Sequence, residues 1–115
     1  MKNKLERYTY NKNSRYVLEK GKEIFNSTKG NWQQIFGNKN KIVLELACGN
    51  GEYTVHESLK NKNKNYIGID IKGSRIWKGA NSLEKENSEN AIFLRIAIEN
   101  ILDFFENDEV SEIMI

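Results

Sequence analysis

The stretch that decides the fold is KIVLELACGNGEYTV, residues 41–55, in which an apolar run leads directly into a turn with two glycines. Residues 41–46 are mostly apolar and partly β-branched, which predicts a buried strand. Residues 52–60 carry a pattern that a helix can adopt. A glycine turn between a strand and a helix is typical of a ligand-binding turn, because glycine lets the backbone approach a bound molecule closely.

The rest of the chain continues this alternation of strand and helix. Further strands are expected at 65–70, 91–97 and 110–115, with amphipathic helices at 73–87 and 99–107. Helices between consecutive strands require parallel pairing through right-handed crossovers. Strands that are apolar throughout are typical of a sheet covered on both faces. The pattern therefore predicts a doubly wound α/β sheet of about four strands, with its ligand beyond their carboxyl ends.

Residues 1–40 form a basic N-terminal arm with a different composition. The arm has nine Lys and Arg residues and three Glu residues, which gives it a net charge of +6. Because the whole chain has a net charge of +2, residues 41–115 carry −4. Within it, 1–13 is expected to be an irregular tail, and 14–36 to hold short helices broken at glycines. A basic arm on an acidic body favours a polyanionic partner, whereas a plain solvated surface explains it equally well.

Cysteine content and hydropathy limit the other possibilities. The single cysteine, Cys48, allows no internal disulfide, which fits a reducing compartment. The chain has one Cys and one His, which are too few ligands for a typical zinc site, and we predict no metal. The N-terminus has no apolar signal region and no stretch is long enough to span a bilayer, so a cytoplasmic location without membrane association is expected.

Polar residues follow each of the first three strands. Glu45 lies near the end of the first strand, Asp70 closes the second, and Glu99 and Asn100 come after the third. Parallel strands bring their carboxyl ends to one edge, so these side chains are expected to share one crevice. An acidic residue at the end of the second strand suits the two hydroxyls of a ribose.

The glycine spacing separates the candidate ligands. A dinucleotide turn needs G-x-G-x-x-G, but counting from Gly49 the third position is Thr54. Counting from Ala47, the first glycine is missing and Glu52 would repel a pyrophosphate at the helix N-terminus. The chain has no G-x-x-x-x-G-K-[ST], which excludes a P-loop. Several carboxylates around the turn favour a cationic ligand with a ribose and no phosphate, such as S-adenosylmethionine.

The same motifs carry a family resemblance. Glu-x-Ala-x-Gly-x-Gly with an Asp at the next strand end resembles the class I methyltransferases, in which a glycine usually stands where this chain has Ala47. IVLELACGNGEYTV, YIGIDIKGSRIWKGA and FLRIAIENILDFF resemble the bacterial tRNA (guanine-N7)-methyltransferase family. The resemblance extends over residues 41–115 and is weaker in the arm. It implies a Rossmann-like fold, of which 41–115 would be the N-terminal half of the S-adenosylmethionine-binding domain.

The resemblance also implies roles for individual residues. Glu45 would contact the methionine end of the cofactor, Asp70 the ribose, and Glu99, in preference to Asn100, the adenine. The full set of implied cofactor contacts is Glu45, Ala47, Gly49, Asn50, Gly51, Asp70, Ile71, Glu99 and Asn100. Contacts to tRNA phosphate are predicted for Lys72, Arg75, Arg7 and Arg15.

The implied reaction is methyl transfer to guanine N7 in the variable loop of tRNA. Guanine N7 has a lone pair and no proton, so no general base is needed and catalysis depends on positioning. We therefore predict no catalytic residue among these 115; the family's Phe-Pro-Asp-Pro motif would lie beyond Ile115, and the chain is expected to be an N-terminal part that is inactive alone. The alternative is a non-catalytic nucleotide- or RNA-binding Rossmann-like module. An unpaired last strand would also favour association between copies.

Overall fold

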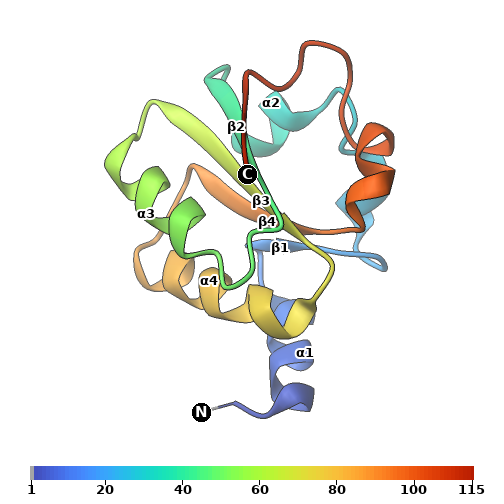
Figure 1. Ribbon diagram of the computed structural model, residues 1–115, viewed down its shortest axis with the longest axis vertical. Helices are drawn as coiled ribbons and strands as arrows, with labels where there is room; N and C mark the ends of the chain where they lie inside the picture. Colours follow the sequence, from blue (N-terminus) through green and yellow to red (C-terminus); the bar gives the residue numbers. More distant parts are fainter. Residues whose placement is uncertain (1) are drawn as a thin grey trace.

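The computed structural model describes residues 2–115, which are built around one parallel sheet (Figure 1). Its strands are β1 Val17–Leu18, β2 Lys41–Leu46, β3 Lys64–Asp70, β4 Ala91–Arg95 and β5 Glu112–Met114. They lie in the order β1-β4-β3-β2-β5, and all neighbouring pairs are parallel. The chain steps from β2 through β3 to β4 and then returns to the other side of β2. That reversal creates a crevice at the carboxyl ends of the strands.

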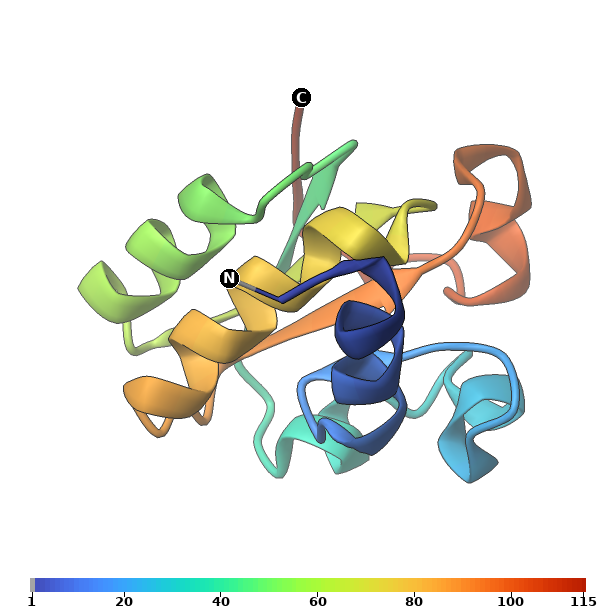
Figure 2. The ribbon, with the colours of Figure 1, turned by 90° about the horizontal axis from the view of Figure 1, so that it is seen from below.

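Helices cover both faces of the sheet, as predicted (Figure 2). The helical segments are α1 Lys4–Asn13, α2 Trp32–Phe36, α3 Glu52–Lys60 and α4 Gly73–Lys85, with 3₁₀ turns η1 Glu23–Ser27 and η2 Ile98–Asp103. α3 and α4 lie on one face, and α2, η1 and η2 lie on the other. The doubly wound α/β prediction is therefore confirmed.

Alternation along the strands builds a separate core on each face. In β2, Val43 packs into the cluster that holds Ile76 and Leu83 of α4. Its neighbours Ile42 and Leu44 belong to the opposite cluster, which contains Trp32 of α2 and Phe105. Successive side chains of a strand point to opposite faces, so an apolar run without polar interruption fills both layers at once.

The N-terminal arm differs from the expectation in two ways. Residues 4–13 are not an irregular tail but the helix α1, which begins with a capping box between Asn3 and Glu6. Val17 and Leu18 then form β1, a fifth strand beside β4. We missed the strand because two residues are too few for a periodic signal. The expected helix at 99–107 is the shorter 3₁₀ segment η2.

The helix α1 is fixed to α4 by specific contacts. Arg7 donates from Nη1 to the carbonyl of Ser74 at 3.1 Å, and Asn11 donates from Nδ2 to the carbonyl of Gly73 at 2.7 Å. The Arg7 guanidinium also lies over the Trp77 ring, 5.1 Å from its centroid, and Tyr10 meets the same ring edge-on at 6.3 Å. The tryptophan of the GSRIWKGA segment is therefore a docking surface for the N-terminal helix.

Three glycines surround the buried ring of Phe93 on β4. A Cβ added at Gly51, Gly68 or Gly79 would lie 2.4, 2.7 and 2.5 Å from atoms of that ring. These positions come from the start of α3, from β3 and from α4, so the ring is the point at which three elements meet. Without the glycines the helices could not approach the sheet this closely.

Candidate functional site

A cavity of about 290 Å³ opens at the carboxyl edge of the sheet. It brings together four residues predicted to bind the cofactor, namely Ala47, Asp70, Ile71 and Glu99, with two predicted to bind RNA, Lys72 and Arg75. The rest of the lining is apolar and consists of Ile96, Ala97 and Ile98. An apolar floor with a few convergent polar groups is the usual character of a small-molecule site.

Asp70 is the most constrained residue of this cavity. Its side chain is buried, and its two oxygens accept backbone hydrogen bonds from the amides of Gly49 and Lys72, both at 2.9 Å. The Arg75 guanidinium lies 4.0 Å from Oδ2. An ionised carboxylate can accept about four hydrogen bonds, so Asp70 keeps acceptor capacity for a ligand hydroxyl. The same carboxylate thus joins the β2–α3 loop to the start of α4 and faces the cavity.

Glu45 has a structural task as well. Its Oε1 accepts from the Thr54 backbone amide at 3.2 Å and from the Thr54 hydroxyl at 2.6 Å. Thr54 lies in the first turn of α3, whose N-cap Gly51 offers no side-chain hydrogen bond. A carboxylate supplied from the adjacent strand therefore caps this helix and complements its dipole. This contact fixes α3 against β2 beside the loop.

The loop between β2 and α3 turns through three residues in the left-handed region. Ala47, Gly49 and Gly51 have φ of 54°, 58° and 74°. A Cβ at Gly49 would meet no atom within 4 Å, whereas Gly51 packs against Phe93. The two glycines therefore differ in role, since Gly49 borders open space and Gly51 serves the core. Between them, Asn50 is exposed.

Cys48 lies beneath this loop and is not a nucleophile. Its backbone amide donates to the Ile69 carbonyl at 2.8 Å, and its thiol is buried. Burial raises the pKa of the Cys48 thiol well above its usual range, and the nearby Asp70 and Glu45 carboxylates raise it further. A protonated buried thiol is inert, so the loop contributes shape instead of a reactive group.

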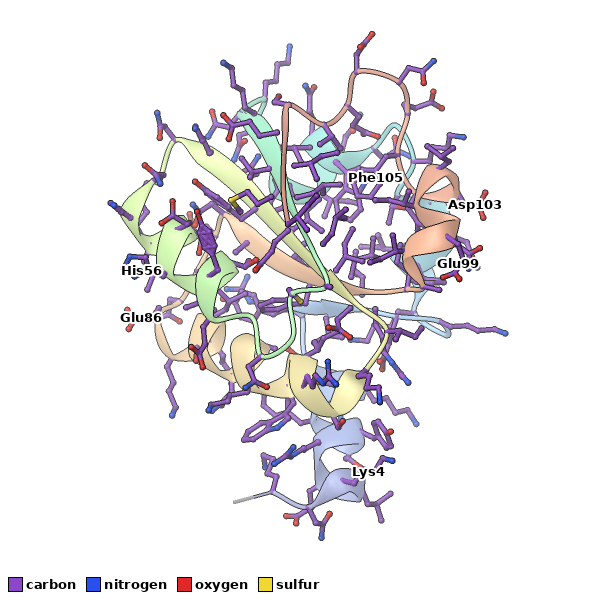
Figure 3. All side chains as sticks on the ribbon, viewed as in Figure 1. Lys4, His56, Glu86, Glu99, Asp103 and Phe105 are labelled. Carbon is purple, nitrogen blue, oxygen red and sulfur yellow. The ribbon has the colours of Figure 1, made fainter. Side chains whose placement is uncertain are left out.

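Five of the predicted cofactor residues do not line the cavity, namely Glu45, Gly49, Asn50, Gly51 and Asn100. Glu99 and Asn100 are both exposed on η2, and of the two only Glu99 lines the cavity. Figure 3 shows Glu99 and Asp103 on the outer side of η2, while Phe105 turns in toward the sheet. His56 points outward from α3 in the same view, away from the carboxyl edge.

The four predicted RNA contacts separate into two groups. Lys72 and Arg75 are exposed at the rim of the cavity, with the Arg75 side chain 52% exposed. Arg7 is half-buried between α1 and α4. Arg15 lies at the opposite edge of the sheet, where its guanidinium contacts the Tyr16 ring and the Ser88 carbonyl. Only the first pair is brought next to the cofactor residues.

Sequence reasoning missed the apolar lining and one arginine. Ile96, Ala97 and Ile98 come directly after β4, in a stretch that we expected to continue as a strand to residue 97. Arg95 donates from Nε to the Ile71 carbonyl at 3.0 Å and pairs with Glu19 at 3.5 Å. The rule that ligands lie beyond strand ends points to the residues after β4, but it does not show which of them face inward.

Metal chemistry and membrane insertion find no support in the described part of the chain. Within residues 2–115, no three or more His, Cys, Asp or Glu side chains are grouped so as to hold a metal ion. No helix among these residues combines the length and apolar character needed to cross a bilayer.

Comparison with known families identifies the class to which this crevice belongs. Residues 39–115 match the family model described as "Putative methyltransferase". The matched region runs from the start of β2 to the end of β5 and includes the whole carboxyl-edge cavity. The chain therefore belongs to this methyltransferase family.

The most informative relatives share one name. Residues of this chain are 45% identical to the tRNA (guanine-N(7)-)-methyltransferase of Christiangramia forsetii, over 99% of this chain and 53% of the relative. The enzymes of the same name from Cytophaga hutchinsonii and Bacteroides thetaiotaomicron are 38% and 44% identical, over 97% of this chain and 51% and 46% of theirs. The family resemblance is thus confirmed, and the chain spans about half the length of these relatives.

Solved structures of methyltransferases share the fold. An antibiotic-related methyltransferase superposes with a TM-score of 0.55 at 20% identity, over 61% of this chain and 37% of that one. WbdD superposes with a TM-score of 0.55 at 19% identity, over 93% of this chain and 27% of its own. The Rossmann-like methyltransferase fold expected from the motifs is confirmed.

Proposed function

We propose that this chain supplies the cofactor-binding part of an S-adenosylmethionine-dependent tRNA (guanine-N7)-methyltransferase. The observation that carries the proposal is the carboxyl-edge crevice, in which Asp70 faces an apolar floor beside the open side of Gly49. The names of the relatives support the same activity. Transfer to guanine N7 in the variable loop of tRNA, the tRNA partner and a cytoplasmic location are part of this proposal.

The chemistry of the crevice fits this cofactor. S-adenosylmethionine would supply a methyl group on a positively charged sulfur. Asp70 would accept from the ribose hydroxyls, and Glu99 would lie toward the adenine over the floor of Ile96 and Ile98. The open space at Gly49 would leave room for the methionine end, and the Glu45 carboxylate on β2 would complement the ammonium and sulfonium charges.

The residues of this chain would bind and orient, and none would react covalently. Cys48 is protonated and buried, and the imidazole of His56 points away from the crevice. We assign the orientation of the guanine to residues that this chain does not contain. Lys72 and Arg75, exposed at the rim, are proposed to meet tRNA phosphate, with Arg7 and Arg15 as weaker candidates because their guanidinium groups already contact the protein.

Calorimetry with S-adenosylhomocysteine and with NAD tests the cofactor assignment. We expect S-adenosylhomocysteine to bind and Asp70→Asn to weaken it by about 10- to 100-fold, since hydrogen bonds to a charged group contribute about 1.5–3 kcal/mol. The matched change Glu89→Gln, at the exposed amino edge of the sheet, should leave the affinity unchanged. Tighter binding of NAD than of S-adenosylhomocysteine would contradict the proposal.

The alternative is a nucleotide- or RNA-binding module without catalysis. This alternative is supported by the length of the chain, which covers only about half of its relatives. An activity of the whole enzyme would then depend on residues in the other half. Calorimetry of the chain with S-adenosylhomocysteine and with tRNA separates the two. Binding of S-adenosylhomocysteine supports the cofactor-binding part of a methyltransferase, and binding of tRNA without S-adenosylhomocysteine supports the module. Methyl incorporation into tRNA from radiolabelled S-adenosylmethionine, above a no-enzyme control, would contradict the module.

A further inference from the structure

Two hydrogen bonds from α1 reach the start of α4. Arg7 donates to the carbonyl of Ser74, and Asn11 donates to the carbonyl of Gly73. Both carbonyls belong to the first turn of α4, which begins immediately after Lys72. The N-terminal helix therefore holds the turn of α4 that borders the crevice, in addition to its contacts with Trp77 and Glu84 farther along that helix.

This first turn has few other restraints. The N-cap residue of α4, Lys72, makes no side-chain capping hydrogen bond. From the crevice side the turn is held by Asp70, whose Oδ1 accepts from the Lys72 amide and whose Oδ2 lies 4.0 Å from Arg75. The carboxylate in turn accepts from the Gly49 amide. A shift of the first turn would therefore move the backbone of Lys72, the Asp70 carboxylate and the Gly49 loop together.

Asn11 is buried between α1 and α4. Its side chain is 1% exposed, and its backbone carbonyl accepts from the Lys22 ammonium at 2.7 Å. The same ammonium also donates to the carbonyls of Ser14 and Val17, so each of its three N–H groups has a protein acceptor. Lys22 thus caps the C-terminal end of α1 and ties it to β1. The helix is therefore anchored to the sheet independently of its contacts with α4.

We propose that α1 is a positioning element of the cofactor crevice, in which Arg7 and Asn11 hold the first turn of α4 so that Asp70 keeps its geometry. The part that concerns cofactor affinity rests on the proposed function, and the part that concerns the crevice geometry does not. Arg7 acts here through the backbone of Ser74 and does not line the crevice. An arginine that sequence reasoning assigned to RNA thereby acquires a role at the cofactor site.

Amide hydrogen exchange of the full chain without cofactor tests the geometric part. In Arg7→Ala and in Asn11→Ala, the amides of Lys72 and Gly49 should exchange about fivefold faster, as expected for a loss of about 1 kcal/mol of restraint. The Phe93 amide, which donates to the Tyr16 carbonyl inside the sheet, is the internal reference for global opening. Unchanged protection of Lys72 and Gly49 relative to Phe93 would overturn the proposal.

Tyr10→Phe is the matched control variant. Tyr10 lies on the same helix α1, and its hydroxyl bonds to the Glu84 carboxylate near the far end of α4. Its removal also costs α1 a contact with α4, but away from the crevice. Faster exchange at Lys72 and Gly49 in this variant, equal to that in Arg7→Ala, would mean that α1 supplies general stability only.

Calorimetry with S-adenosylhomocysteine tests the affinity part. Arg7→Ala and Asn11→Ala should weaken binding about fivefold, Arg7→Lys should recover part of the loss, and Tyr10→Phe should bind as the wild type does. Equal affinity in all variants would overturn the positioning role. If the wild-type chain itself fails to bind, the proposed function fails, and the exchange rates at Lys72 and Gly49 still decide whether α1 sets the crevice geometry.

Discussion

At the scale of single residues, the loop after β2 holds an alanine in a backbone conformation that glycine adopts more readily. Ala47 has φ of 54°, a left-handed conformation that favours glycine, and the related class I methyltransferases usually have glycine there. The sequence showed that a glycine was missing but not that the alanine keeps the conformation of one. Only the backbone angle reveals that the substitution is tolerated with strain.

Ala47→Gly should therefore stabilise the protein slightly. Relief of the left-handed strain, about 1–2 kcal/mol, exceeds the entropic penalty of a glycine in the unfolded chain, about 0.5–1 kcal/mol, so the unfolding free energy should rise by up to about 1 kcal/mol. Ala97→Gly is the control, because Ala97 borders the same cavity with an ordinary φ of −74° and should lose stability. Denaturant unfolding of both variants measures the difference, and equal losses would contradict the strain argument.

At the scale of elements, long periodic segments were predictable and short or capped ones were not. β2, β3, β4, α3 and α4 were predicted within a few residues because their apolar patterns repeat. The strand β1 has two residues, and α1 is polar along most of its length, so neither has such a pattern. The capping signal at Asn3 and Glu6 was visible in the sequence, and it marks the start of α1.

The placement of the candidate residues was predictable to the same extent. Strand ends placed Asp70, Ile71 and Glu99 at one cavity with Ala47, because parallel topology alone brings them together. The capping task of Glu45 and the burial of Gly51 against Phe93 depend on how α3 packs on the sheet. Such packing is set by contacts between distant segments, which spacing along the chain does not encode.

The close packing of Gly51, Gly68 and Gly79 around the Phe93 ring gives a prediction at the scale of elements. Gly→Ala within a helix ordinarily stabilises by about 1 kcal/mol. In Gly79→Ala, however, the added Cβ would lie 2.5 Å from the Phe93 ring and 3.0 Å from the Asn50 carbonyl, so we expect a loss of about 2 kcal/mol from overpacking. Lys78→Ala, exposed on the same helix, should change stability by less than about 0.5 kcal/mol.

A double variant identifies the cause of that loss. Phe93→Leu removes the ring atoms that the new Cβ would meet, so Gly79→Ala should cost less in this background than in the wild type. The measurement is the unfolding free energy of all four combinations. Additive losses would show that the ring is not what excludes a side chain at position 79.

At the scale of the whole molecule, the sheet has one strand that packs poorly. β5 pairs with β2, and within residues 2–115 no strand covers its other edge. Ile113 is 58% exposed and Ile115 is fully exposed, while Met114 packs against the core. Open backbone groups beside exposed isoleucines are the conditions for strand pairing between molecules. We expect the chain to associate through this edge.

Ile113→Lys should suppress this association. A charge on the edge strand is a known means of preventing pairing, and the side chain at 113 is exposed, so the fold should be retained. Sedimentation velocity across a range of concentrations should show self-association of the wild type and a monomer for the variant. Leu102→Lys, on an exposed side chain of η2, is the control. A monomeric wild type, or association unchanged by Ile113→Lys, would contradict the prediction.

The short strand β1 has a consequence for how the molecule is made. Val17 pairs with Phe93 and Leu18 with Leu94, so β1 has its strand partner far along the chain, in β4. Lys22, by contrast, caps α1 and holds it to Val17 through contacts within the N-terminal segment itself. Contacts between residues so distant in the chain form slowly, because the loop between them must close first. During synthesis β1 therefore cannot pair until β4 has left the ribosome.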